Sequence, residues 1–146
     1  MANKRHRVAI IGCGRLGQYY AEAYTTYPDT EIVAIAEHNP KRREQAGTKF
    51  GVSKLYAKSE DLLNDIVPDI AAIVTPSKHY KEAVIACAKA GVKAISTDKP
   101  IAAKLSDVDE MINTCRSQGS ILAGGILQRA MNENQELADR LKSGVY

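Results

Sequence analysis

The chain has 146 residues, of which 45% are hydrophobic and 25% are charged, and its formal net charge is +3. This length and composition fit one globular domain with a buried core, and they exclude a disordered or fibrous chain. The basic residues gather at 4–7 and 41–43 rather than in a stripe interleaved with aromatics, so no nucleic-acid partner is expected.

Five short runs rich in isoleucine, valine and alanine recur along the chain, with a weaker sixth among them. The runs do not alternate with polar residues, which is typical of strands buried on both faces. Segments with helical periodicity lie between them, and Leu16, Tyr20, Ala23 and Tyr27 form the apolar face of the first. The expected strands cover residues 8–11, 31–36, 54–57 (the weak one), 70–74, 93–96 and 121–123, and a last helix covers about residues 130–143.

This alternation predicts an α/β fold, a Rossmann-type doubly wound parallel sheet of about six strands with helices on both faces. Right-handed crossovers then give the strand order 3-2-1-4-5-6. We expect Ser59 and Ser106 to cap helices at their N-termini, and Gly119 and Gly144 to end helices. Residues 1–146 are expected to form a single domain.

The first strand leads directly into a glycine-rich loop, Gly12-Cys13-Gly14-Arg15-Leu16-Gly17, which opens a helix. In this strand–loop–helix context a GxGxxG pattern binds the pyrophosphate of a dinucleotide. Gly12 permits the tight turn, Gly14 lets the backbone approach the phosphates, and Gly17 allows close packing of helix on strand. The N–H groups of the helix that starts near Arg15 attract the anion, so these residues and Leu16 are the expected contacts. The alternative is a glycine-rich turn without a ligand.

Glu37 ends the second strand, twenty residues after Gly17. An acidic side chain there accepts hydrogen bonds from the adenosine ribose and repels a 2′-phosphate, which favours NAD. His38, Lys41 and Arg42 follow, and they could instead turn toward a 2′-phosphate, so NADP stays open. The structural alternatives are a Glu37 charge that faces solvent and a solvated basic helix face.

The fourth strand ends in Thr75, Pro76 and Ser77, where the strand order reverses and ligands bind in such folds. Their backbone and hydroxyl groups can line the nicotinamide side of a cofactor. As plain structure, Pro76 would be the first residue of a helix and Ser77 a polar residue in its first turn. Both interpretations stay open for these side chains.

The fifth strand is followed by Lys99 and Pro100. A lysine at the carboxyl end of a central strand would lie beside the nicotinamide and could donate to a substrate oxygen. A partly desolvated ammonium could act as an acid or a base. Lys99 is therefore the expected catalytic residue, although a lysine in isolation is more often a surface residue.

The cysteines, Cys13, Cys87 and Cys115, form neither a CxxC pair nor a Cys/His pattern with metal-ligand spacing. We expect buried thiols in a reducing compartment and no metal site. No apolar run approaches a signal peptide or a membrane span, so we expect a cytoplasmic protein without a membrane partner.

These landmarks, in this order, resemble the glucose-fructose oxidoreductase, inositol dehydrogenase and rhizopine-catabolism (Gfo/Idh/MocA) family of oxidoreductases. The most specific element is Asp98-Lys99-Pro100 followed by Ile101-Ala102, which is similar to the family's Glu-Lys-Pro-hydrophobic-Ala signature. The resemblance implies an N-terminal NAD(P)-binding domain and hydride transfer between NAD(P) and a sugar, cyclitol or related polyol. It also implies that Lys99 lies in the active site and that Asp98, Pro100 and His79 lie at the cofactor.

The chain departs from the family pattern in four places. Asp98 replaces the commoner glutamate, and Tyr80 takes the position usually held by a histidine, with His79 one residue early. After Gly125, residues 126–130 keep only Arg129 of the usual Gly-Phe-Asn-Arg-Arg-Phe segment. The family's C-terminal α/β domain, which carries further catalytic residues and usually the dimer interface, is absent.

We therefore expect the isolated chain to bind the cofactor without turnover, and to meet a polyol or sugar substrate only with a second domain. Ile121, Leu122, Ile126 and Leu127 lie where that domain would pack, so a homo-oligomer through this region is expected. The main alternative is a non-catalytic NAD(P)-responsive module that signals through a partner protein. Another Rossmann reductase explains the Lys99 signature less well.

Overall fold

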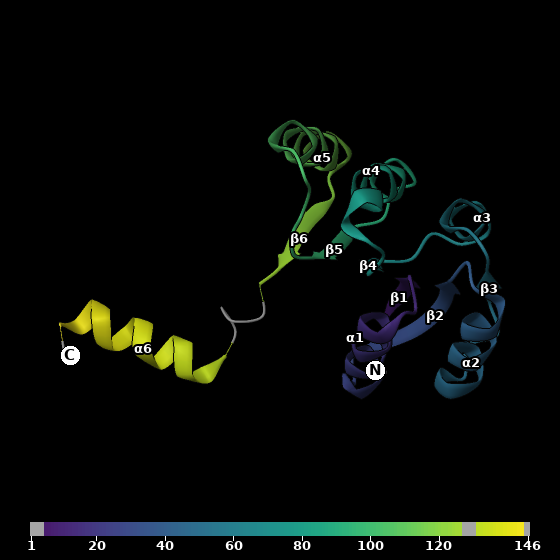
Figure 1. Ribbon diagram of the computed structural model, residues 1–146, viewed down its shortest axis with the longest axis horizontal. Coiled ribbons are helices and arrows are strands. Elements are labelled where there is room, and N and C mark those ends of the chain that lie inside the picture. The colour runs from purple at the N-terminus through teal and green to yellow at the C-terminus, as the bar shows by residue number, and fades with distance from the viewer. Residues whose placement is uncertain (1–4, 127–130, 145–146) are drawn as a thin grey trace.

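The computed structural model describes residues 5–126 and 131–144 (Figure 1). One six-stranded parallel sheet has the order β3-β2-β1-β4-β5-β6, which confirms the predicted doubly wound topology. The strands are β1 (His6–Ile11), β2 (Thr30–Ala36), β3 (Leu55–Tyr56), β4 (Ile70–Ile73), β5 (Ala94–Asp98) and β6 (Ile121–Gly125). The helices are α1 (Arg15–Thr26), α2 (Pro40–Phe50), α3 (Ser59–Asp65), the 3-10 turn η1 (Ser77–His79), α4 (Tyr80–Lys89), α5 (Leu105–Gln118) and α6 (Asn132–Ser143).

Helices cover both faces of the sheet, α1 and α2 on one and α3, α4 and α5 on the other (Figure 1). Along β1, Val8 and Ile10 pack toward α1 and α2, whereas Ala9 and Ile11 pack toward the opposite layer. All four residues are buried, which explains why the strand sequence is uninterrupted rather than alternating.

The β6 edge is less covered than the rest of the sheet. Ile121 and Ile126 are 68% and 56% exposed. Figure 1 shows α6 beyond this edge, apart from both helical layers, and none of the residues described in α6 is buried. Lys4, Leu127 and Arg129, which entered the sequence expectations, lie outside the described residues.

The predicted helix ends are partly right. Gly119 and Gly144 end α5 and α6 in the left-handed conformation, with φ of +68° and +75°, as expected. The predicted N-caps are wrong, because Ser59 is the first residue of α3 and Ser106 lies inside α5. No side-chain hydrogen bond caps the N-terminus of either helix.

The remaining expectations concern cysteines, membranes and metals. Cys13, Cys87 and Cys115 are free and buried, as predicted. Within residues 5–126 and 131–144, no helix has both the length and the hydropathy to cross a membrane. In the same part of the chain, no group of three or more His, Cys, Asp or Glu side chains could hold a metal ion.

Candidate functional site

The sheet order places all the predicted site residues along one edge. Parallel strands point the same way, so the segments that follow β2, β1, β4 and β5 lie in a row at the carboxyl edge of the sheet. In that row stand Glu37, the glycine loop, Thr75 and Lys99.

The glycine loop adopts a turn that only glycine tolerates at two positions. Gly12 has a φ of +94°, and a Cβ there would lie 2.7 Å from the carbonyl oxygen of Val74. A Cβ on Gly17 would lie 2.0 Å from the carbonyl oxygen of Gly12. The tight turn and the close packing of α1 on the loop are therefore as predicted.

The third glycine, Gly14, faces open space at the start of α1. A Cβ on Gly14 would meet no atom within 4 Å. Gly14 caps α1 without any side-chain hydrogen bond, and the first turn of the helix holds no acidic residue. The first turn of α1 thus supplies no carboxylate to the positive end of the helix dipole, and Arg15 and Leu16 beside it are exposed.

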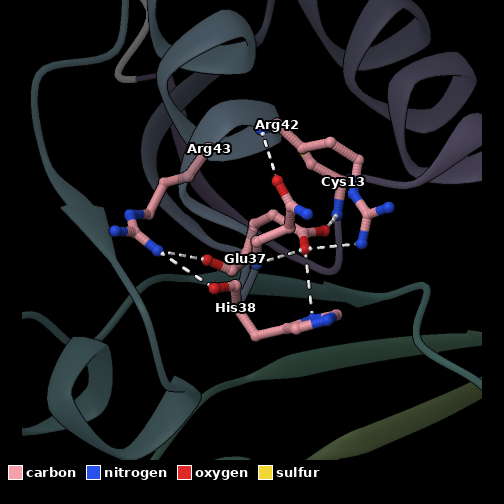
Figure 2. Close-up of polar contacts among 6 residues, drawn as sticks. Cys13, Glu37, His38, Arg42 and Arg43 are labelled. Atoms are coloured by element: carbon pink, nitrogen blue, oxygen red, sulfur yellow. Dashed lines mark hydrogen bonds and ion pairs between the residues drawn. The ribbon is translucent and has the colours of Figure 1, made fainter.

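The Glu37 carboxylate ties the end of β2 to this loop (Figure 2). Its Oε2 accepts a hydrogen bond of 2.8 Å from the backbone N–H of Cys13. Its Oε1 accepts bonds of 2.9 Å from the N–H of Asn39 and 3.0 Å from Nη2 of Arg42, and it lies 3.1 Å from Nδ1 of His38. Glu37 is only 4% exposed, so the alternative of a charge facing solvent is wrong.

These contacts set the protonation state of Glu37. Burial raises its pKa, but hydrogen bonds from the Asn39 and Cys13 backbones and from Arg42 outweigh it, so the pKa falls below 4.5. The carboxylate is therefore ionised at neutral pH. Three hydrogen bonds reach a group with about four acceptor positions, and Oε2 accepts only one of them, from Cys13. His38 and Arg42 are the exposed partners and can move away.

The expectation of a solvated basic face is confirmed for the exposure of Lys41 and Arg42, whereas Arg43 is half-buried. Arg42 pairs with Glu37, and Nη1 of Arg43 donates a 2.7 Å hydrogen bond to the carbonyl oxygen of Glu37 (Figure 2). Lys41 is exposed, as predicted. The positive charge of Arg42 is thus largely committed to Glu37.

After β4, the chain makes a 3-10 turn before α4 begins. Pro76 precedes this turn with a ψ of 137°, so the expectation that it starts a helix is wrong. Thr75 has a buried hydroxyl without a hydrogen-bond partner in the described part of the chain. Ser77 begins the turn and His79 ends it exposed, while Tyr80 is 3% exposed.

After β5, Asp98 and Lys99 differ sharply in exposure. Asp98 is 6% exposed, whereas the Lys99 side chain is 70% exposed and its Nζ lies 3.9 Å from Oδ2 of Asp98. The Lys99 ammonium is therefore largely solvated in this chain, as a surface lysine would be. Lys99 and Pro100 are joined by a cis peptide bond. A cavity of about 150 Å³ adjoins them, lined by Asp98, Lys99, Ile101, Gly124, Gly125 and Ile126.

Two tyrosines near Asp98 were missed as site residues. The sequence placed Tyr20 in the apolar face of the first helix and treated Tyr80 only as a substitute for a histidine. In the structure, the negative charge of Asp98 raises the pKa of each, after the larger effect of burial. The helical spacing of Tyr20 could not reveal this, because β5 and β6 come about 75 to 105 residues later in the chain.

The family model for GFO_IDH_MocA, described as "Oxidoreductase family, NAD-binding Rossmann fold", matches residues 6–126. Myo-inositol 2-dehydrogenase from Thermotoga maritima is 31% identical over 139 residues, which are 95% of this chain and 41% of that protein. Trans-1,2-dihydrobenzene-1,2-diol dehydrogenase from Mus musculus is 31% identical over 141 residues, or 95% of this chain and 42% of that protein.

Solved structures show the same similarity. An oxidoreductase from Agrobacterium radiobacter, solved with NAD+, L-tartaric acid and magnesium, superposes with a TM-score of 0.91 at 28% identity. The match covers 97% of this chain and 41% of that one. This chain therefore spans about two fifths of the length of the relatives that it matches.

Proposed function

Because this chain belongs to the oxidoreductase family that has the NAD-binding Rossmann fold of the Gfo/Idh/MocA proteins, we propose that residues 1–146 form its cofactor-binding domain. The full reaction proposed is hydride transfer between NAD(H) and a carbon of a sugar, cyclitol or related polyol. The names of the relatives support this substrate class, since they include dehydrogenases of inositol and of a diol. We propose a cytoplasmic location, which three buried free thiols support.

The loop and helix fit the pyrophosphate of NAD. The observation that carries the proposal is the bare, uncapped N-terminus of α1 at Gly14, where no Cβ would block an approaching phosphate. Arg15, Leu16 and Gly17 lie in the first turn of α1, so their backbone N–H groups have no partner within the helix and can donate to phosphate oxygens.

Glu37 would hold the adenosine ribose. Its ionised carboxylate can accept hydrogen bonds from the ribose hydroxyls once His38 or Arg42 has moved aside. The negative charge of Glu37 would also repel a 2′-phosphate. The positive charges of Arg42 and Lys41, which follow Glu37 closely in the sequence, would oppose this repulsion. We therefore propose NAD(H) as the preferred cofactor.

The residues after β4 and β5 would line the reacting end of the cofactor. NAD, when bound, supplies a ring carbon that takes up or releases hydride. The backbone around Thr75, Pro76 and Ser77 would border that ring, with His79 and Asp98 nearby. Lys99 would hold a proton at the substrate oxygen: the amine accepts it during alcohol oxidation, and the ammonium donates it during reduction.

The isolated chain is proposed to bind the cofactor without turnover. Hydride transfer needs the substrate carbon fixed within about 3–3.5 Å of the ring, an alignment that contributes on the order of 7–11 kcal/mol. The ammonium of Lys99 is largely solvated, and the cavity beside it is small and lies at an open sheet edge. Lys99 and the cavity beside it would therefore border a substrate on one side.

A titration of the 146-residue chain with NADH and with NADPH tests the proposal. We expect NADH to bind at least about tenfold more tightly, as one carboxylate–ribose hydrogen bond and phosphate repulsion would require. Equal binding would contradict the role of Glu37 and assign the pocket to Arg42 and Lys41. If neither NADH nor NADPH binds, the proposed function is overturned.

A further inference from the structure

Asp98 lies at the end of β5, where its buried side chain adjoins the exposed Lys99. A Cβ added to Gly125 would lie 2.8 Å from the hydroxyl oxygen of Tyr20 and 3.3 Å from Oδ1 of Asp98. These two oxygens therefore flank the same point above β6. The absence of a side chain at Gly125 leaves the space through which Tyr20 reaches the end of β5.

Tyr80 approaches Asp98 from the other side of the sheet. Tyr80 is 3% exposed, and its hydroxyl lies close enough to Asp98 for the charge of that carboxylate to act on its pKa. Tyr20 comes from α1 and Tyr80 from α4, which cover opposite faces of the sheet (Figure 1). The two tyrosines thus approach Asp98 from opposite faces of the sheet, and the Tyr20 hydroxyl and Asp98 Oδ1 flank the same point at Gly125.

The charges near Tyr20 keep its hydroxyl protonated. Burial raises the pKa of Tyr20, and the charge of Asp98 raises it further, with smaller effects from Tyr80 and Tyr24. The cation nearest to this group on β5 and its turn is Lys99, whose Nζ lies 3.9 Å from Oδ2 of Asp98. A neutral phenol is a hydrogen-bond donor, and the adjacent carboxylate is an acceptor.

We propose that Tyr20 is a positioning residue for the Asp98–Lys99 pair. Its hydroxyl restrains the Asp98 carboxylate from the α1 side, and the restrained carboxylate orients the ammonium of Lys99. The helix whose N-terminus faces the pyrophosphate site is thereby connected to the lysine at the reacting end. The importance of this arrangement for catalysis rests on the proposed function, whereas the arrangement itself can be tested without cofactor.

The first test compares Tyr20→Phe with Tyr19→Phe, which removes a hydroxyl from an exposed position on the same helix. NMR of the cofactor-free 146-residue chain would follow the ε-methylene signals of the lysines, with Lys99→Arg identifying the Lys99 signal. We expect Tyr20→Phe to shift the Lys99 signal and leave those of Lys54 and Lys81 unchanged, and Tyr19→Phe to shift none of the three. A Lys99 signal that is the same in both variants would overturn the proposal.

The second test observes the Tyr20 hydroxyl instead of the Lys99 ammonium, and it holds even if Tyr20→Phe fails to fold. In Asp98→Asn, the pKa of Tyr20 should fall, measured in an alkaline titration from the assigned NMR signals of the Tyr20 ring. An unchanged titration of Tyr20 in Asp98→Asn would overturn the proposal. NADH titration of the unmodified chain separates the two hypotheses, because loss of NADH binding contradicts the proposed function and leaves both contact tests intact.

Discussion

At the scale of single residues, Glu37 carries the most information. Its position at the end of the second strand could be predicted from sequence, because strand and acidic residue follow each other directly. Its burial and its three hydrogen-bond donors could not, since Cys13 lies 24 residues earlier and the orientation of Arg42 depends on how α2 meets β2. The same carboxylate therefore serves the loop and, in our proposal, the ribose.

Glu37→Gln should reduce the loss of stability that the chain undergoes as the pH falls into the acid range. The pKa of Glu37 is depressed in the folded chain, so its contribution to stability is present above its unfolded pKa, near 4.5, and is lost as pH falls below that value. Melting temperatures of the unmodified chain and of Glu37→Gln, measured between neutral pH and pH about 3, should converge toward the acid end. Glu31→Gln, at an exposed position on the same strand, is the control, and equal convergence in that variant would contradict the prediction.

At the scale of elements, the order of strands and helices was predictable because each buried strand gives an uninterrupted apolar run. The glycine C-caps were predictable too, because a left-handed residue favours glycine. The N-caps were not, since Ser59 and Ser106 lie one or two residues inside helices whose ends are set by packing. The apolar face assigned to the first helix is likewise partly exposed, as Tyr27 shows at 66%.

Gly14→Ala and Gly17→Ala should separate cofactor binding from helix packing in α1. A methyl group on Gly14 meets open space, so the fold should stay intact while NADH affinity falls by about tenfold or more. On Gly17 it would lie 2.0 Å from the carbonyl oxygen of Gly12, so stability should fall as well. Thermal melting and NADH titration of both variants check this, and normal NADH binding by Gly14→Ala would show that the loop is not the cofactor site.

At the scale of the whole molecule, apolar surface is left open on the α1 side. An apolar groove of about 380 Å³ runs along α1, lined by Leu16, Tyr19, Tyr20, Ala23, Tyr24 and Tyr27. Ile121 on β6 and Leu137 and Leu141 on α6 are also exposed. The sequence predicted an apolar edge at β6, but not the groove, because a helix with three tyrosines, followed by Tyr27, resembles a core helix until its neighbours are known.

Self-association and lack of turnover should therefore be measured together. We expect the chain to form oligomers as its concentration rises, because exposed apolar patches of this kind favour association. NADH formation from inositols, polyols and sugars should stay absent even at high concentration. Sedimentation and an activity assay with Lys99→Ala as the control would test both; lysine-dependent turnover would mean that association rebuilds a complete site.

The hydrogen bond from the Cys13 N–H to Glu37 has a consequence for chemical labelling. The Cys13 thiol is fully buried in the glycine loop, and burial together with the Glu37 charge raises its pKa to about 11. A thiol reagent can therefore reach Cys13 only when the loop opens, and the rate of alkylation becomes a measure of that opening. NADH should slow the labelling of Cys13 and leave the slow labelling of Cys87, which lies in the opposite layer, unchanged. The labelling rate of Cys13 then reports the opening of the glycine loop, and the labelling rate of Cys87 is the internal reference.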